Sequence, residues 1–275
     1  MFFDTHCHLY KEYYDDINNI IKLSKTDGIS KFINAGCDKN SNSEVLSMIN
    51  NKDIFGVIGY HPEFAEDITQ NDLNMLENEI KNNQVIGIGE IGLDYHYENF
   101  DKEKQIKIFD YQLCLAEKYN LPVVIHSRNA TDDTIKMLKK HKVVGVIHSF
   151  SGSLETAKEY IKMGFVLGIN GVITFKNCNL IEVIRNIGID YLVLETDSPY
   201  LTPVPLRGKQ NYPGNIKYVI EFLCANLNVS KEDLQKSTNN NVKNIFKLNI
   251  WWNSYIFLIV YKNISKCYNI RYKRG

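Results

Sequence analysis

The first chemically informative residues are His6 and His8, in the run Asp4-Thr5-His6-Cys7-His8. Side chains two residues apart on a β-strand point to the same face, so both imidazoles would project together. Neutral imidazoles are common metal ligands. The pair therefore predicts half of a metal site, whereas Cys7 would point to the other face and serve in packing.

Further histidines and carboxylates stand late in other short apolar segments. Five of the seven histidines share this position. An unpaired carboxylate such as Glu90 is costly to bury, and a neighbouring cation removes that cost. The predicted metal ligands are therefore His6, His8, Glu90, His126, His148 and Asp197.

Six ligands are too many for one tetrahedral ion, and they suit two divalent ions with Glu90 as the bridge. Imidazole and carboxylate together do not distinguish Mg, Mn and Zn. The ions would activate a water and polarise a phosphoryl or carbonyl oxygen, and Asp197 would orient or deprotonate that water. His61 is predicted to lie outside the ligand set, where it would contact a phosphate or protonate a leaving group.

The two other histidines fit this pattern less well. His96 follows the fourth apolar segment and is a weaker candidate for a residue at the mouth of the site. His141 stands in a lysine-rich stretch and is expected to be solvated.

Eight apolar segments, most of them rich in Val and Ile, are typical of buried parallel strands. Helical patterns separate them, for example at 102–118, 130–140 and 154–163, and two more follow at 214–227 and 231–246, where Ser230 is a candidate N-cap. This alternation predicts a (β/α)8 barrel with its site at the carboxyl ends of the strands, and an open doubly wound sheet is the alternative. The predicted strands are 2–9, 31–36, 54–61, 85–94, 122–127, 145–149, 165–173 and 191–197.

The bulk composition agrees with one large domain. The chain has 275 residues, and its 32 basic and 32 acidic residues cancel, so nucleic-acid contact would need a local patch. Six scattered cysteines form no CxxC pair and indicate reduced thiols. A start without a leader favours the cytoplasm or nucleus, with unconventional export left open.

The segment 249–275 differs from the barrel domain predicted over 1–248. It holds an apolar aromatic run and a basic end. The run is shorter than the roughly 20 residues of a membrane helix. An interfacial membrane anchor, an element packed on the barrel and a wrongly predicted gene end stay open, and the tail is assigned no function.

Several motifs in this order resemble the TatD family of metal-dependent deoxyribonucleases, within the amidohydrolase-type barrel superfamily. The resemblance runs from Phe3 to about Leu248, and its ordered set of motifs is specific although each motif alone is weak. The motifs are Asp4-Thr5-His6-Cys7-His8, Gly59-Tyr60-His61-Pro62, Gly89-Glu90-Ile91-Gly92-Leu93-Asp94-Tyr95, His126-Ser127-Arg128, His148-Ser149-Phe150-Ser151-Gly152 and Glu195-Thr196-Asp197-Ser198-Pro199-Tyr200-Leu201, followed by Leu206-Arg207-Gly208-Lys209 and Asn211-Tyr212-Pro213.

The resemblance implies a TIM-like barrel that hydrolyses DNA phosphodiesters with divalent metal, often from a 3′ end. It implies the same six metal ligands, and a catalytic or phosphate-contacting role for His61. Two positions depart from the family pattern: Asn129 replaces an Asp, and Glu63 replaces a second His and adds negative charge near the mouth. Two rival hypotheses are another hydrolase of this barrel, acting on a cyclic amide, lactone or small phosphoester, and a non-catalytic nucleic-acid-binding relative.

A basic rim and nearby aromatic residues support nucleic acid as the substrate class. Stacking on aromatic rings tolerates any base, so little sequence specificity is expected. The expected partner is single- or double-stranded DNA, with RNA left open, and no stable protein partner is implied. Predicted substrate contacts are Arg128, Lys176, Arg207, Lys209 and Tyr95, and further candidates for stacking are Tyr60, Phe64, Tyr97, Phe150 and Tyr200.

Overall fold

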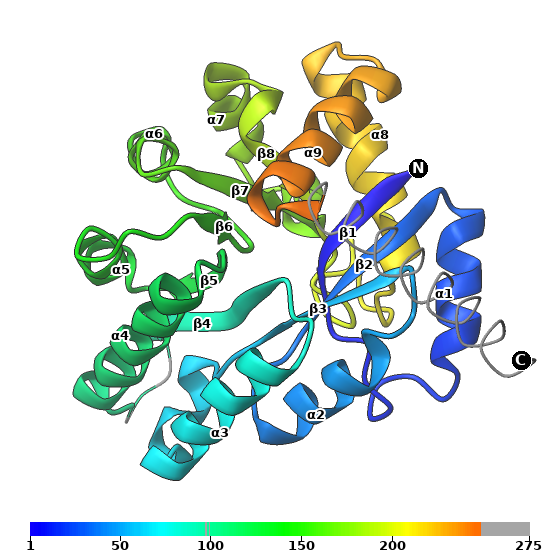
Figure 1. Ribbon diagram of the computed structural model, residues 1–275. Coiled ribbons are helices and arrows are strands. Elements are labelled where there is room, and N and C mark those ends of the chain that lie inside the picture. Colours follow the sequence, from blue (N-terminus) through cyan, green and yellow to red (C-terminus); the bar gives the residue numbers. More distant parts are fainter. Residues whose placement is uncertain (97, 99, 249–275) are drawn as a thin grey trace, which may run out of the picture.

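Eight parallel strands lie side by side in sequence order in the computed structural model, which describes residues 1–248 except 97 and 99 (Figure 1). The sheet curls so that its first and last strands meet. Asp197 N donates to His6 O at 2.9 Å, and His8 N donates to Ser198 O at 2.8 Å. The predicted barrel is confirmed, and the open doubly wound sheet is wrong.

All eight predicted strands are present, but several are shorter than expected. The sixth and eighth have only three residues each, so His148 and Asp197 lie in the loops that follow them. The strands are β1 (Phe2–Cys7), β2 (Ile29–Ala35), β3 (Ile54–Ile58), β4 (Gly87–Asp94), β5 (Val123–Arg128), β6 (Gly145–Ile147), β7 (Phe165–Ile169) and β8 (Leu192–Leu194).

Helices cover the outside of the barrel (Figure 1). Several begin at a side-chain cap, as the composition of their first turns indicates. Ser230, for instance, accepts from Asp233 N at 3.0 Å, as predicted. Between residues 1 and 248 the α-helices are α1 (Ile17–Thr26), α2 (Lys39–Met48), α3 (Gln70–Asn82), α4 (Lys102–Tyr119), α5 (Thr131–Leu138), α6 (Leu154–Lys162), α7 (Leu180–Ile187), α8 (Ile216–Leu227) and α9 (Lys231–Ile245).

The barrel interior is a packed core, and α9 closes one end of it. Branched residues of six strands meet there with Val242 and Phe246, and Leu248 at the end of the described chain is also buried in this cluster. α9 lies against β1 and β8 (Figure 1). α9 lies at the end of the barrel away from the loops that leave the carboxyl ends of the strands, so those loops are free to form a site. The strand residues in this core are Ile33, Ala35, Val57, Val124, Val146, Val166 and Val193.

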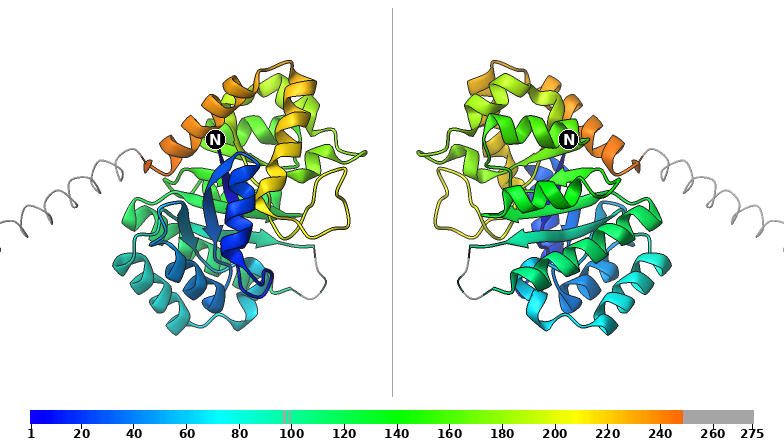
Figure 2. Two further views of the ribbon diagram at one scale, coloured as in Figure 1. Left: turned by 90° about the vertical axis from the view of Figure 1, so that its right-hand side faces the viewer. Right: turned by 90° about the vertical axis from the view of Figure 1, so that its left-hand side faces the viewer.

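The loop after β8, in yellow, projects from one side of the barrel in both views of Figure 2. This side receives the carboxyl end of every strand, because all eight strands are parallel. Within the described residues, no helix combines the length and apolarity that a membrane crossing requires. The predicted tail 249–275 lies outside the described residues.

Candidate metal centre

His6 and His8 project from the end of β1 toward one point, as their spacing predicts. Their Nε2 atoms lie 3.3 Å apart, and the rings meet edge to face. His6 Nε2 is also 3.2 Å from Oε2 of Glu90, and His8 Nε2 is 3.9 Å from that oxygen. Two imidazoles and one carboxylate oxygen, all buried, therefore surround a space where a cation would fit.

Glu90 presents its second oxygen to a different group of imidazoles. Oε1 lies 2.9 Å from His126 Nδ1, 3.6 Å from His61 Nε2 and 3.8 Å from His148 Nε2. The carboxyl group is 4% exposed and stands between the two groups of rings. This is the geometry that a bridging ligand between two cations requires.

Asp197 completes the first group from the loop after β8, the strand that meets β1. Its Oδ1 lies 3.4 Å from His8 Nε2 and 3.5 Å from His148 Nε2. The residue has a left-handed backbone, with φ 55°, and its N–H donates to His6 O. Such a conformation is uncommon for a residue other than glycine, and here the β1–β8 junction holds it in place.

The charges of the cluster fit a bound cation. Burial alone would lower the pKa of His126 and of His148, but the adjoining carboxylates raise them, to about 9 and about 10. Burial alone would raise the pKa of Glu90, yet the surrounding histidines hold it well below its usual range. The carboxylates therefore favour positive charge in the cluster. Protons on the histidines supply that charge when no metal is bound. Divalent metal ions fit this donor set, and the residues that would hold them are the six predicted ligands.

In three of the histidines, the ring nitrogen that faces away from the centre lies close to a carboxylate or carbonyl oxygen, which orients the ring. His8 Nδ1 lies 3.2 Å from the carbonyl of Ala35, His126 Nε2 lies 2.9 Å from Asp94 Oδ2, and His148 Nδ1 lies 3.0 Å from Glu195 Oε1. A carboxylate or carbonyl behind a histidine holds the ring nitrogen that faces the metal in its unprotonated form.

Asp94 and Glu195 are functional residues that the sequence reasoning missed. Asp94 stands four residues after Glu90 on β4, and so shares its face. Glu195 directly follows β8, where its carboxylate is fully buried. The signal in both cases is an acidic residue late in an apolar strand, beside a residue already assigned to the metal.

Gly168 on β7 leaves the space that Glu195 occupies. A Cβ at this glycine would stand 2.3 Å from Glu195 Oε2. The same carboxylate accepts from Ser149 N at 2.6 Å through its other oxygen. Ser149 after β6 and Gly168 on β7 thus position the carboxylate of Glu195 next to His148.

His61 lies at the edge of the ligand cluster. Its Nε2 is 3.6 Å from Glu90, and its ring meets that of His126 edge to face at 4.3 Å, close enough for the three to be grouped as candidate ligands. However, its Nδ1 accepts from Glu63 N at 3.2 Å. Burial, together with His126, lowers its pKa to about 3, so the ring is neutral and carries its proton on Nε2. That nitrogen is a donor, which suits contact with substrate rather than with metal.

Cys37 is a second neighbour that the sequence reasoning did not select. Its sulfur is 3.7 Å from Glu90 Oε2 and 3.9 Å from His8 Nδ1. Burial raises the pKa of this thiol to about 11, so it stays protonated at neutral pH. A protonated thiol is a weak donor to the carboxylate and not a ligand.

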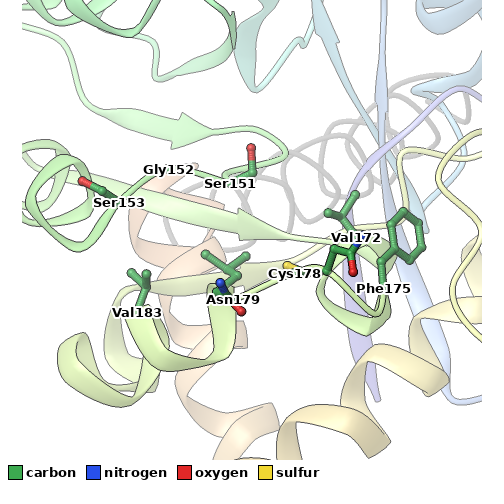
Figure 3. A pocket seen from close by; sticks show the side chains of 10 residues that line it. Ser151, Gly152, Ser153, Val172, Phe175, Cys178, Asn179 and Val183 are labelled. Carbon is green, nitrogen blue, oxygen red and sulfur yellow. The ribbon is translucent and has the colours of Figure 1, made fainter.

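A cavity of about 490 Å³ opens between the loops after β6 and β7 (Figure 3). Val172, Phe175 and Val183 give it apolar walls, and Ser151 and Asn179 add polar groups. The guanidinium of Arg207 lies 3.7 Å from the centre of the Phe175 ring. The loop after β8 is joined to this wall, since Val204 N donates to Thr174 Oγ1 at 2.9 Å.

The predicted basic residues divide between two places. Lys176, Arg207 and Lys209 are exposed. Lys176 stands on the loop after β7 that lines the cavity, and Arg207 stands on the loop after β8 and packs on Phe175. Arg128 is exposed at the end of β5.

A second cavity, of about 300 Å³, lies next to His61 and is strongly acidic. Its lining includes Glu63, Glu66, Asp94, Glu98 and Asp101.

The aromatic residues differ in what they can contact. Tyr60 and Phe150 are buried in the core, so the expectation that they stack on bases is wrong. Tyr95 packs against Phe100, with ring centres 4.8 Å apart, and donates to Asp133. Its substrate contact stays a prediction.

Other rings near the mouth are accessible to different degrees. Tyr200 is half exposed, and its ring lies 6.3 Å from that of His8. Phe64 lies 6.5 Å from the ring of His61. His96 is exposed beside Asn129, as expected for a residue at the mouth. Tyr97 lies outside the described residues.

Metal binding to the metal-free protein should release protons at pH 7. His126 and His148 have pKa values of about 9 and about 10, so both carry a proton that a metal must displace. Apparent affinity should therefore rise with pH until these values are passed. Calorimetric titration in two buffers of different ionisation enthalpy measures the release. Equal observed enthalpies in both buffers would contradict this protonation state.

Comparison with known proteins gives a consistent set of relatives. The family model described as TatD related DNase matches residues 3–247. A protein called "Uncharacterized metal-dependent hydrolase YabD", from Bacillus subtilis, is 39% identical over 255 residues, covering 90% of this chain and 100% of the relative. The relative YcfH from Escherichia coli carries the same description and is 30% identical over 257 residues, covering 89% of this chain and 95% of its own length.

Solved structures agree on the fold. The crystal structure of YjjV, a TatD homologue from Escherichia coli, has a TM-score of 0.85 at 29% identity, covering 90% of this chain and 98% of that one. A TatD family hydrolase from Entamoeba histolytica has a TM-score of 0.79 at 24% identity, covering 89% of this chain and 97% of that one. The second similarity shows the barrel alone.

Proposed function

This chain belongs to the TatD related DNase family of metal-dependent hydrolases, and we propose that it hydrolyses DNA phosphodiester bonds, as a 3′-5′ exonuclease with little sequence specificity. The single observation that carries the proposal is the position of Glu90. Its two oxygens face two separate groups of imidazoles, next to a neutral histidine donor, and Arg207 packs on the Phe175 ring that lines the larger cavity.

Each residue of the centre is suited to a different chemical role. Bound divalent ions would supply charge stabilisation at a phosphoryl oxygen and a lowered pKa for water. Asp197 stays ionised, because His148 and His8 hold its pKa below the usual value although burial opposes this, so its carboxylate is available as a proton acceptor. His61 offers its Nε2–H to a phosphate oxygen. Glu195 and Asp94 keep the rings of His148 and His126 in position.

Electrostatics favours one path for the DNA strand. The acidic cavity beside His61 repels phosphates, whereas Lys176, Arg207 and Lys209 attract them on the β7–β8 side. The cavity lined by Phe175 has room for a base, and an aromatic ring with a guanidinium on it is a sequence-tolerant surface for stacking. We therefore place the 3′-terminal nucleotides along the loops after β7 and β8.

End-labelled DNA oligonucleotides test the proposal directly. The wild-type protein, supplied with Mg, Mn or Zn in turn, should shorten single strands one nucleotide at a time from the 3′ end. Internal cleavage would contradict the exonuclease assignment. Hydrolysis of a cyclic amide, lactone or small phosphoester without action on DNA would favour the related hydrolase, and binding without cleavage would favour the non-catalytic relative.

Arg207→Ala should weaken binding of single-stranded DNA by about threefold to thirtyfold, because a phosphate or base contact is lost. The slope of log affinity against log salt should also fall by about 0.7 if the contact is to phosphate. Arg207→Lys separates the two roles, since it keeps the charge and loses the planar stack on Phe175.

Fluorescence anisotropy with a labelled oligonucleotide at several salt concentrations gives both quantities. Lys158→Ala, on the exposed side of α6 away from the β8 loop, is the charge-matched control. Affinity and slope equal to wild type in Arg207→Ala would remove this loop from the DNA path.

A further inference from the structure

A second group of ligand-type side chains lies outside the barrel, between α4 and the turn that follows α5. It contains Asp110, Cys114 and His141, each with a donor atom within 4.8 Å of the other two. Asp110 and Cys114 are four residues apart on α4 and so share one helix face. The three side chains present one oxygen, one sulfur and one nitrogen.

His141 is held in the orientation that a metal ligand needs. Its Nδ1 lies 3.1 Å from Glu117 Oε2, and its Nε2 lies 3.0 Å from Asp110 Oδ1. Its side chain is only 8% exposed, so the expectation that this histidine is solvated is wrong. In a metal-bound form Nδ1–H would donate to Glu117, and the lone pair of Nε2 would face the cation in place of the present hydrogen bond to Asp110.

Glu117 fits the role of orienting residue. Besides facing His141, its carboxylate accepts from the backbone N–H of Lys142, and so it is tied to the same turn. A carboxylate behind the histidine is the arrangement that also occurs twice in the catalytic centre, at Asp94 and Glu195. The cluster therefore has both a donor set and a supporting residue.

We propose that Asp110, Cys114 and His141 form a separate binding site for one divalent cation of the zinc type. Thiolate and imidazole select zinc, cobalt or cadmium over magnesium and calcium. Bonds of about 2.0–2.3 Å to a tetrahedral ion place its ligand atoms roughly 3.3–3.8 Å apart, which small side-chain movements reach from the observed spacing. Water would fill the fourth position.

The proposed site is distinct from the catalytic centre. The residues at 139–142 lead into the beginning of β6, and α4 leads into the beginning of β5. The cluster therefore lies toward the opposite end of the barrel from the catalytic loops. An ion here would connect α4 to the α5–β6 turn, and would act on stability and thiol reactivity rather than on hydrolysis.

Cobalt titration tests the site, because a cobalt–thiolate bond gives near-ultraviolet charge-transfer absorption that imidazole and carboxylate ligands do not give. All proteins carry Cys37→Ser, which removes the thiol near Glu90 from the measurement. The parent should show the band, Cys114→Ser should lose it, and His141→Gln should need more cobalt to reach it. Cys178→Ser is the control that should keep it.

Alkylation of Cys114 by iodoacetamide provides a second readout, with the modified peptide quantified by mass spectrometry. Saturating zinc should slow modification by about tenfold or more, since a metal-bound thiolate is not free to react. Asp110→Asn should reduce this protection. A cobalt spectrum that is unchanged by Cys114→Ser, or alkylation that zinc does not slow, would overturn the proposal and leave His141 as an ion-pair bridge between two carboxylates.

Discussion

Glu90→Gln should reduce metal-dependent hydrolysis by roughly 10³-fold or more. The substitution keeps the volume of the side chain but removes the charge that faces both groups of imidazoles. Charge stabilisation by bound ions contributes several kcal/mol to such reactions, and each 1.4 kcal/mol is a tenfold change in rate. The variant should also bind less metal, because a neutral amide cannot bridge two cations.

The measurement combines a cleavage assay on labelled DNA with metal content by mass spectrometry and a thermal melt. Glu103→Gln, on the exposed first turn of α4, is the matched control and should behave as wild type. A folded Glu90→Gln protein with full metal content and wild-type rates would exclude Glu90 as the bridge.

Glu195→Gln should lower activity by about 10–100-fold while leaving the metal-facing atoms in place. Glu195 is fully buried, and its carboxylate stands 3.0 Å behind Nδ1 of His148. Loss of a carboxylate behind a metal-facing histidine typically costs that much in affinity or activity. The amide oxygen can still accept from Ser149 N, so the loop after β6 should keep its conformation.

Activity measured against metal concentration distinguishes a positioning role from a structural one. A positioning role predicts that more metal is needed for half-maximal activity, with a melting temperature close to wild type. Glu155→Gln, exposed in the first turn of α6, is the control. A variant whose melting temperature falls, but whose metal dependence is unchanged, would show that Glu195 serves only to fill the space beside Gly168.

Hydrophobic patterning was sufficient to predict the barrel. Each of the eight apolar segments overlaps a strand, because burial on both faces leaves a nearly continuous apolar run that is visible without partners. The lengths of β6 and β8 were less accessible. Their last predicted residues turn into the site instead of continuing the sheet, and Ser149 and Asp197 adopt left-handed backbones that the apolar pattern does not encode.

The burial of individual polar residues was also hard to predict. His141 is surrounded by lysines in the sequence, yet its ring lies between two carboxylates of α4. Tyr60 neighbours a site histidine, yet its side chain points into the core and donates to Asp72 O. Such placements depend on helices that are distant in the chain, so local composition is a poor guide to them.

The sequence by itself determined the barrel, its direction and the set of side chains that meet at its mouth, because strand periodicity and parallel order bring the carboxyl ends together. Only the tertiary structure decided which nitrogen of each histidine faces the centre, which carboxylate stands behind it and which loop meets Arg207. Those choices follow from backbone turns and from hydrogen bonds between segments far apart in the chain, such as Asp197 N with His6 O. The spacing of residues in the sequence does not determine which ring nitrogens, carboxylates and loops meet.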